Sequence, residues 1–219
     1  MEKKIKAIIL NKGQTILRIL IILSPILVGI LLWDRLPDRI ATHFGMDGTP
    51  NGWSDKVFAV FGLPLILLVI QFLCSAVTLA DPKRERINAK MMNLVLWIIP
   101  IVSVVCNLAT YGYALKLSIN IEKVVMVMVG VIFLLIGNYM PKCKQNYSMG
   151  IKVAWTLASE DNWNHTQRFA GWIYVAAGIA AIIAGMIGFI PTTVFVFIVL
   201  LAAFLPILYS FIYYLKNKQ

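Results

Sequence analysis

The sequence has few charged residues and few cysteines, and both shortages exclude classes of protein. Only 14% of its 219 residues are charged and 60% are hydrophobic, whereas an average soluble domain is about 25% charged and about 45–50% apolar. A soluble globular protein is therefore excluded, because the long uncharged blocks leave too little polar surface. Cys74, Cys106 and Cys143 show neither a disulfide framework nor metal-ligand spacing, so we interpret them as core residues.

Ionisable residues are missing from most of the apolar blocks. Spans two to six contain no Asp, Glu, His, Lys or Arg, although ion-coupled transporters, proton pumps and intramembrane hydrolases place such residues inside the bundle. We therefore expect no enzyme, no catalytic residue and no cofactor. His43 and His165 lie on opposite predicted faces and cannot act together. A transporter or exporter of a small or peptidic substrate stays open as the alternative function, because six spans suffice for one.

Six apolar blocks are each long enough to cross a hydrocarbon core, which takes roughly 17–25 helical residues. The last two form one uncharged run that is too long for a single crossing, and Gly188 and Pro191 predict a tight hairpin there. The first block ends without a cleavage pattern and is expected to remain as an anchor. The sequence thus predicts an all-α integral membrane protein with six spanning helices over residues 16–33, 57–80, 91–115, 124–140, 169–190 and 192–215.

The distribution of basic residues predicts the orientation. Fifteen of the 20 Lys and Arg residues lie in the N-terminal segment, the loops 81–90 and 141–168 and the C-terminal tail. Because short loops rich in Lys and Arg stay in the cytoplasm, we expect both termini and these loops to be cytoplasmic. A net charge of +10 can also indicate nucleic-acid binding, but basic residues spread over four juxtamembrane segments match lipid headgroups better. We expect no direct nucleic-acid contact.

The chain divides into three regions on this topology. Residues 1–80 hold the first helix pair with an extracellular loop over 34–56, residues 81–123 hold the third helix with its flanking loops, and residues 124–219 hold the cytoplasmic loop 141–168 and the C-terminal hairpin. Small residues recur every four positions in the fifth span, which predicts a close helix–helix contact within the chain or between copies. They are Ala177, Ala181 and Gly185, with Ala180, Ala184 and Gly188 on the neighbouring stripe.

The extracellular loop is dense in turn-forming residues and is expected to be compact. His43 shares it with Asp38, Asp47 and Asp55, but one histidine with scattered carboxylates is a weak indication of a metal site. We expect no metal, and instead a hydrogen bond from His43 to the neighbouring backbone. Trp53 is expected at the membrane edge, where aromatic residues anchor.

The order Leu-Pro-Asp-Arg-Ile, Thr-His-Phe, Gly, Gly-Trp and Lys in this loop resembles the extracellular DUF1648-type domain of SdpI-like membrane proteins, the sporulation-delaying-protein immunity family. Ala41 stands where that family usually has proline. The resemblance implies an extracellular motif or toxin-binding site at Pro37, His43, Phe44, Gly48, Gly52, Trp53 and Lys56.

The cytoplasmic loop carries the second half of the resemblance. It resembles the signature of the SdpI family, and the resemblance implies a partner-docking motif at Asn138, Pro141, Asn146, Gly150, Lys152, Trp155, Thr156, Trp163 and Arg168. Relatives often show Arg-Thr-Pro-Trp where this chain has lysine, valine, alanine and tryptophan over residues 152–155. Lysine cannot reproduce the bidentate fork of arginine, so a role that needs that fork is not expected here.

The same loop also has a physical interpretation. Ser159 followed by two acidic residues is typical of a helix N-terminus, so we expect a helix to begin there and to run into the fifth span. Trp155 and Trp163 are then expected at the membrane interface. The loop is either a docking platform or a simple connection anchored by aromatic residues, with four basic side chains directed to headgroups: Lys142, Lys144, Lys152 and Arg168.

The family resemblance implies a function that the composition alone does not. Such proteins protect a bacterium from a secreted membrane-active peptide toxin, and some sequester a winged-helix repressor at the membrane when toxin is bound. The expected partners are therefore the lipid bilayer, a peptide toxin on the outer face and a cytoplasmic winged-helix repressor.

Overall fold

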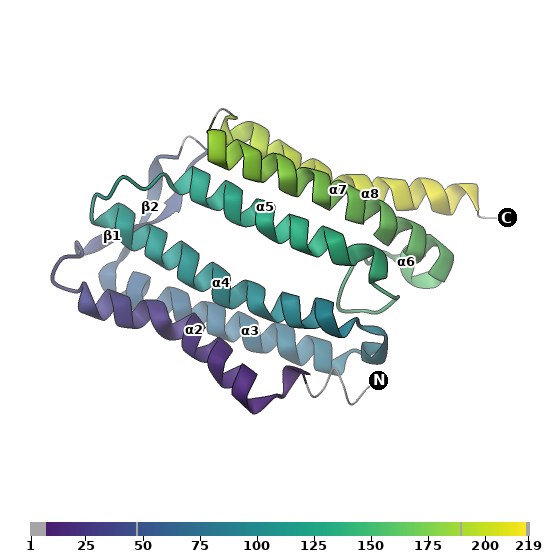
Figure 1. Cartoon of the computed structure of the whole chain (residues 1–219), viewed down its shortest axis with the longest axis horizontal. Coiled ribbons are helices and arrows are strands. Elements are labelled where there is room, and N and C mark those ends of the chain that lie inside the picture. The colour runs from purple at the N-terminus through teal and green to yellow at the C-terminus, as the bar shows by residue number, and fades with distance from the viewer. Residues whose placement is uncertain (1–7, 47, 189, 218–219) are drawn as a thin grey trace.

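Six helices dominate the fold and run side by side (Figure 1). The structure, a computed structural model, describes residues 8–46, 48–188 and 190–217, and in these ranges six helices are long and apolar enough to cross a membrane. The predicted six-span membrane fold is confirmed. The helices are α2 (Lys12–Leu31), α3 (Leu63–Ala80, continuing a π-helical turn over Phe58–Gly62), α4 (Ala89–Ala114), α5 (Ile121–Tyr139), α7 (Glu160–Ile187) and α8 (Thr192–Lys216).

Side-chain caps set where these helices begin. The side-chain oxygens of Asn11, Asn88, Asn120 and Ser159 each accept a backbone N–H of the first turn that follows, which satisfies donors that have no partner within the helix. The predicted helix start at Ser159 is thus confirmed. Gly188 ends α7 in the left-handed conformation, with φ of 75°, as predicted for the hairpin that leads into α8.

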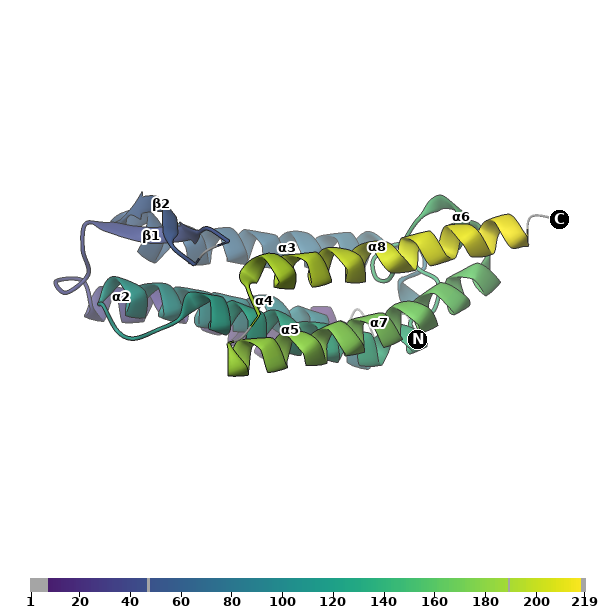
Figure 2. The ribbon, with the colours of Figure 1, turned by 90° about the horizontal axis from the view of Figure 1, so that it is seen from above.

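The helices form two groups of three. α2, α3 and α4 pack together, α5, α7 and α8 pack together, and α4 contacts α5 between the groups (Figure 1). Seen from above, α3 and α8 lie over a layer made by the other four (Figure 2). α2 starts and α8 ends at one end of the bundle, here called the inner end, and the loop 34–56 lies at the opposite, outer end. Which end faces the cytoplasm stays a prediction from the charge distribution.

Glycines allow α5 and α7 to approach each other closely. A Cβ atom built on Gly178 would lie 2.6 Å from the Leu134 nitrogen and 2.7 Å from the Gly130 carbonyl oxygen, so only glycine fits there. Two helical turns further along α5, a Cβ atom built on Gly137 would lie 2.9 Å from the Gly171 carbonyl oxygen. Of the predicted small residues, Ala177, Ala181, Ala184 and Gly185 are buried within the chain, whereas Gly188 is exposed. Such close van der Waals packing favours association of helices in lipid.

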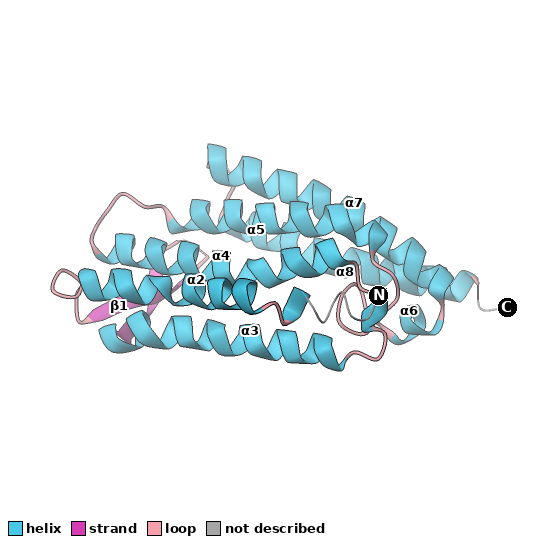
Figure 3. Ribbon diagram, turned by 60° about the horizontal axis from the view of Figure 1, so that its bottom comes forward, coloured by secondary structure: helices cyan, strands magenta, loops and turns pink. Residues whose placement is uncertain are grey.

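The loop at the outer end is a β-hairpin, which the all-α prediction did not include. Strand β1 (Arg39–Phe44) pairs antiparallel with β2 (Pro50–Asp55), shown in magenta in Figure 3. The loop is compact, as its turn residues predicted.

Polar side chains inside the bundle link helices. The Gln71 amide donates to the Leu96 carbonyl 3.3 Å away, and the Ser103 hydroxyl donates to the Ile22 carbonyl at 2.8 Å. These bonds join α3 and α2 to α4.

Candidate functional site

The hairpin holds the predicted extracellular residues, and most of them shape it. Nδ1 of His43 hydrogen-bonds to Oδ1 of Asn51 on the opposite strand. The predicted backbone partner of His43 is therefore wrong, because the carboxamide of Asn51 lies in reach across the ladder. Gly52 faces His43, and a Cβ there would lie 2.9 Å from the His43 Cβ. Gly48 takes the left-handed conformation, with φ of 71°, at the turn.

Two further contacts fix the hairpin to the helices. The ring of Phe44 packs edge-on against Tyr113 of α4, with 5.1 Å between centroids. The Lys56 ammonium lies 3.2 Å from the Trp33 carbonyl oxygen and 3.4 Å from the Asp38 carboxylate. These contacts hold the hairpin over the ends of α2 and α4. Phe44 and Lys56 therefore have a structural role in the position of the hairpin.

An outer groove of about 470 Å³ lies between the hairpin and the connection from α4 to α5. Its lining brings two predicted residues together with segments that sequence reasoning missed: Pro37, Arg39, Ala41, Trp53, Tyr113, Ala114, Lys116, Leu117, Ser118 and Ile119. Trp53 is 49% exposed. The connection over residues 115–119 carries no motif, and only the fold brings it to the hairpin.

The carboxylates near His43 do not make a metal site with it in the part of the chain that the structure describes. No three His, Cys, Asp or Glu side chains come close enough there to hold an ion. Asp47 lies outside the described residues.

At the inner end, residues 143–153 fold into a hydrogen-bonded cap, here called the inner loop. Asn146 is fully buried, and its Oδ1 accepts the backbone N–H groups of Ser148 and Met149 at 2.9 and 2.7 Å. The Gln167 amide of α7 binds both the N–H and the carbonyl of Ile151. Gly150 has a φ of 100°, and a Cβ there would meet the Gln167 Oε1 at 2.9 Å. The inner loop therefore has a fixed shape.

Two tryptophans attach the inner loop and the segment after it to the helices. Trp163 is completely buried, and its indole nitrogen donates to the Cys143 carbonyl at 2.6 Å. The prediction that Trp163 lies at the membrane interface is wrong, because the inner loop covers its ring. Trp155, in the short helix α6 (Ala154–Ala158), donates to the Ser210 hydroxyl of α8 at 2.8 Å.

The nine predicted docking residues divide by exposure. Asn146, Thr156 and Trp163 are completely buried, so they support the loop and have no surface that a partner can touch. Four others are exposed and lie on the end of α5, the inner loop and α7: Asn138, Pro141, Lys152 and Arg168. The ammonium of Lys152 also donates to the carbonyls of residues 147 and 148. Arg168 forms no such hydrogen bond within the part of the chain that the structure describes.

Asp81 and Gln145 connect the two helix groups, and no sequence pattern predicted a role for either. The Asp81 carboxylate, 3% exposed, accepts the Tyr147 N–H at 2.9 Å and the Ser148 hydroxyl at 2.6 Å. The Gln145 side chain accepts a hydrogen bond from Lys83 at 2.7 Å. No local signal could have found them, because the partners lie more than sixty residues apart in sequence.

Cys143 is part of this buried cluster. Burial raises the pKa of its thiol from 9.0 to about 11, against the smaller lowering effects of a hydrogen bond from Asn146 and the charge of Lys152. The thiol therefore stays protonated at neutral pH, and a protonated buried thiol is unreactive. This agrees with the interpretation of Cys143 as a core residue. The same interpretation is wrong for Cys74, whose side chain is exposed on the surface of α3.

Known protein families match two segments of the chain, one that includes the inner loop and one that includes the hairpin. Residues 142–213 match the SdpI/YfhL protein family, and residues 20–68 match the domain of unknown function DUF1648. The resemblance to the SdpI-like family is confirmed. The first match covers the whole inner loop, α7 and most of α8, and the second covers the hairpin with parts of α2 and α3 on either side of it.

A curated SdpI-like relative spans nearly the whole chain. The protein named immunity protein SdpI, from Bacillus subtilis (strain 168), is 26% identical over 208 residues, which cover 93% of this chain and 97% of that protein. No solved structure matches the chain. The chain is thus a multi-pass membrane protein, with one candidate site at each end of its bundle.

Proposed function

We propose that this protein protects a bacterial cell against a secreted membrane-active peptide toxin. The observation that carries the proposal is the similarity to immunity protein SdpI along almost the full length of both chains. Because the match includes both ends and all six spans, it supports transfer of the whole activity and not of one domain. In this proposal the outer end faces the medium, in agreement with the excess of basic residues at the inner end.

The outer groove is the proposed toxin site. It presents the rings of Trp53 and Tyr113 beside the cationic side chains of Arg39 and Lys116. Aromatic rings in a partly exposed groove are the side chains that most often dominate binding energy, and the two cations suit acidic groups or the terminal carboxylate of a peptide. A peptide approaching the bilayer surface is captured there before it inserts.

Removal of the Trp53 ring is expected to abolish most of the protection. Wild-type protein expressed in a toxin-sensitive strain should raise the lethal concentration of the sporulation-delaying peptide, and Trp53→Ala should reduce that protection by roughly thirtyfold if Trp53 acts as a binding hot spot. Killing curves at matched membrane expression measure both effects. The side chain is half exposed, so the variant is expected to fold.

Met46→Ala is the matched control for this experiment. Met46 is another large apolar residue of the hairpin region, 59% exposed, and it does not line the outer groove. It should protect as the wild type does. Unchanged killing with wild-type protein present in the membrane contradicts the immunity proposal, whereas equal protection by both variants contradicts only the placement of the site.

The inner end is the proposed docking surface for a winged-helix repressor. A toxin in the outer groove contacts the connection from α4 to α5, and these two helices join the two helix groups down to the inner loop. A small displacement of one helix group relative to the other at the outer groove therefore also changes the packing at the inner end, as in other switches that repack helices. Arg168 of α7 is exposed there and is suited to an acidic patch on a partner.

Charge reversal at Arg168 tests the docking surface. Arg168→Glu should reduce the amount of winged-helix protein that crosslinks to the chain in toxin-treated cells by tenfold or more, since a like charge replaces an attractive one. Lys216→Glu, an exposed reversal at the end of α8, should leave recovery unchanged. Quantitative mass spectrometry of crosslinked membranes gives the readout. Failure of the wild-type chain to recover any DNA-binding protein contradicts the docking proposal and leaves the immunity proposal standing.

A further inference from the structure

We propose that the seam between the two helix groups binds one anionic phospholipid, with its headgroup in a basic cavity at the inner end and an acyl chain in an apolar groove between α4 and α5. The inference rests on two cavities and on their alignment, and it does not depend on the immunity proposal.

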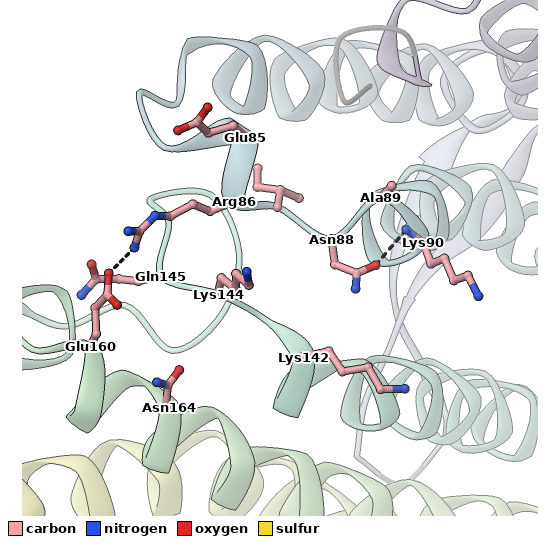
Figure 4. Close-up of a pocket in the computed structure, with 11 residues that line it drawn as sticks. Glu85, Arg86, Asn88, Ala89, Lys90, Lys142, Lys144, Gln145, Glu160 and Asn164 are labelled. Carbon is pink, nitrogen blue, oxygen red and sulfur yellow. Dashed lines mark hydrogen bonds and ion pairs between the residues drawn. The ribbon is translucent and has the colours of Figure 1, made fainter. Parts of the chain in front are cut away.

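The first cavity, here called the headgroup cavity, has a volume of about 770 Å³ and opens between the segment 85–90 that leads into α4, residues 142–145 and the start of α7 (Figure 4). Four of its lining residues are basic and two are acidic, an excess of two positive charges. Arg86 and Glu160 pair with each other. The remaining basic residues of the lining are Lys90, Lys142 and Lys144, which form no direct ion pair among the described residues. Lys144 acts on Glu160 only through its charge, which contributes to the lowered pKa of that carboxyl.

The second cavity, here called the acyl groove, has a volume of about 530 Å³ and lies along the facing sides of α4 and α5. Apart from Lys123 at its outer end, the lining is entirely apolar: Leu94, Trp97, Ile98, Ile101, Val105, Val124, Val127, Met128, Val131, Ile132 and Leu135. Such a surface in a membrane is filled by hydrocarbon, because water cannot hydrogen-bond to it.

The two cavities share one face of α4. Lys90 precedes Leu94 by four residues, which places both on one stripe of α4, and the stripe continues through Trp97, Ile101 and Val105. Lys142 lies in the 3-10 turn Met140–Lys142 that directly follows α5, at the inner end of the bundle. The lysines therefore stand at the end of the acyl groove, as a headgroup site must.

The acyl groove is long enough for one acyl chain. From Leu94 to Val105 the helix rises about 17 Å at ~1.5 Å per residue, more than half of the ~30 Å hydrocarbon core. A chain entering from the headgroup cavity thus extends toward Lys123 in the first turn of α5. A free phosphate would fill the cavity but leave the groove unoccupied, and a zwitterionic lipid would fill the groove but leave the charge excess uncompensated. An anionic phospholipid compensates the positive charge of the headgroup cavity and also fills the acyl groove.

The test measures lipid binding to the full-length protein in detergent by native mass spectrometry. Phosphatidylglycerol should bind in a one-to-one complex and phosphatidylcholine of the same chain length at least tenfold more weakly. Glycerol 3-phosphate, which has the phosphate without the chains, should not compete. Equal binding of the two lipids overturns the headgroup site, and competition by glycerol 3-phosphate at the affinity of the lipid overturns the assignment to a lipid.

Two pairs of variants locate the bound lipid. The double variant K90Q/K142Q should weaken phosphatidylglycerol binding roughly thirtyfold, given the attraction between one basic residue and an anionic lipid surface. K12Q/K216Q removes the same charge from exposed helix ends outside the cavity and should change binding less than threefold. Equal losses for the two pairs would mean that general surface charge holds the lipid, which overturns the proposal.

The acyl groove is tested by filling it. Ile101→Trp places a larger ring in the groove and should displace the lipid, whereas Ile66→Trp adds the same ring to a similarly exposed position of α3 and should not. Thermal unfolding without added lipid shows that both variants are folded. Retention of phosphatidylglycerol by folded Ile101→Trp at wild-type affinity overturns the groove assignment.

Discussion

Replacing Gly178 with leucine is expected to separate α5 from α7 and to destabilise the second helix group by about 3 kcal/mol or more. The new Cβ would lie 2.6 Å from the Leu134 nitrogen and 2.7 Å from the Gly130 oxygen. Both are backbone atoms, so no side-chain rotation can make room. In lipid the association of helices depends on this close packing, because hydrocarbon surrounds the separated helices as well as the packed ones.

The readout is the midpoint of thermal unfolding in detergent, with the monomer fraction from size-exclusion chromatography. A loss of this size should lower the midpoint by roughly 6–12 °C. Ala176→Leu is the control: it lies two residues away on the same helix, and its side chain is exposed. It should unfold within about 2 °C of the wild type. Equal midpoints for the two variants would contradict the proposed contact.

The helices of this fold could be predicted from sequence because hydrocarbon imposes a length and excludes charge. The packing partners could not. Gly171, Gly178 and Gly185 recur every seven residues, as do Gly130 and Gly137, but this spacing does not say which helix meets which. Small residues permit close approach to any neighbour, and only the topology pairs α5 with α7.

The outer loop was predictable as compact but not as a hairpin. Its turn residues are evident, whereas the segment 39–55 is too polar and too rich in glycine for a clear alternation of apolar residues. The outer groove needs the connection over residues 115–119 as well. No sequence pattern in that segment predicts a binding site, because the segment lines the groove only where the fold brings it beside the hairpin.

The interfacial position predicted for Trp163 was wrong because its hydrogen-bond partner comes from a distant segment, the inner loop. A tryptophan six residues before an apolar block is typical of an interfacial anchor, and the same side chain is equally suited to a buried core when polar partners are present. The Cys143 carbonyl is that partner, and it comes from a segment twenty residues earlier. Asp81 was missed for the same reason, since its partners follow it by 66 and 67 residues.

Replacing Trp163 with alanine is expected to have the second large effect, a loss of about 3–5 kcal/mol. Its ring is buried in a cluster that contains Met91 and Leu96 from α4 and Met149 from the inner loop, so it holds the two helix groups together. The change leaves a cavity, and it also leaves the Cys143 carbonyl without its donor, which adds the cost of an unpaired buried acceptor.

Trp172→Ala separates this role from the general loss of a large aromatic residue. Trp172 lies on the same helix but is 73% exposed, so its removal should cost less than about 0.5 kcal/mol. Limited proteolysis supplies the local readout: Trp163→Ala should expose the inner loop to cleavage at temperatures where wild type and Trp172→Ala are resistant, because the loop loses the ring that it covers. Cleavage of all three at the same rate would show that the polar bonds of Asn146 and Gln167 alone hold the inner loop, and that the two helix groups do not depend on the buried indole for their contact.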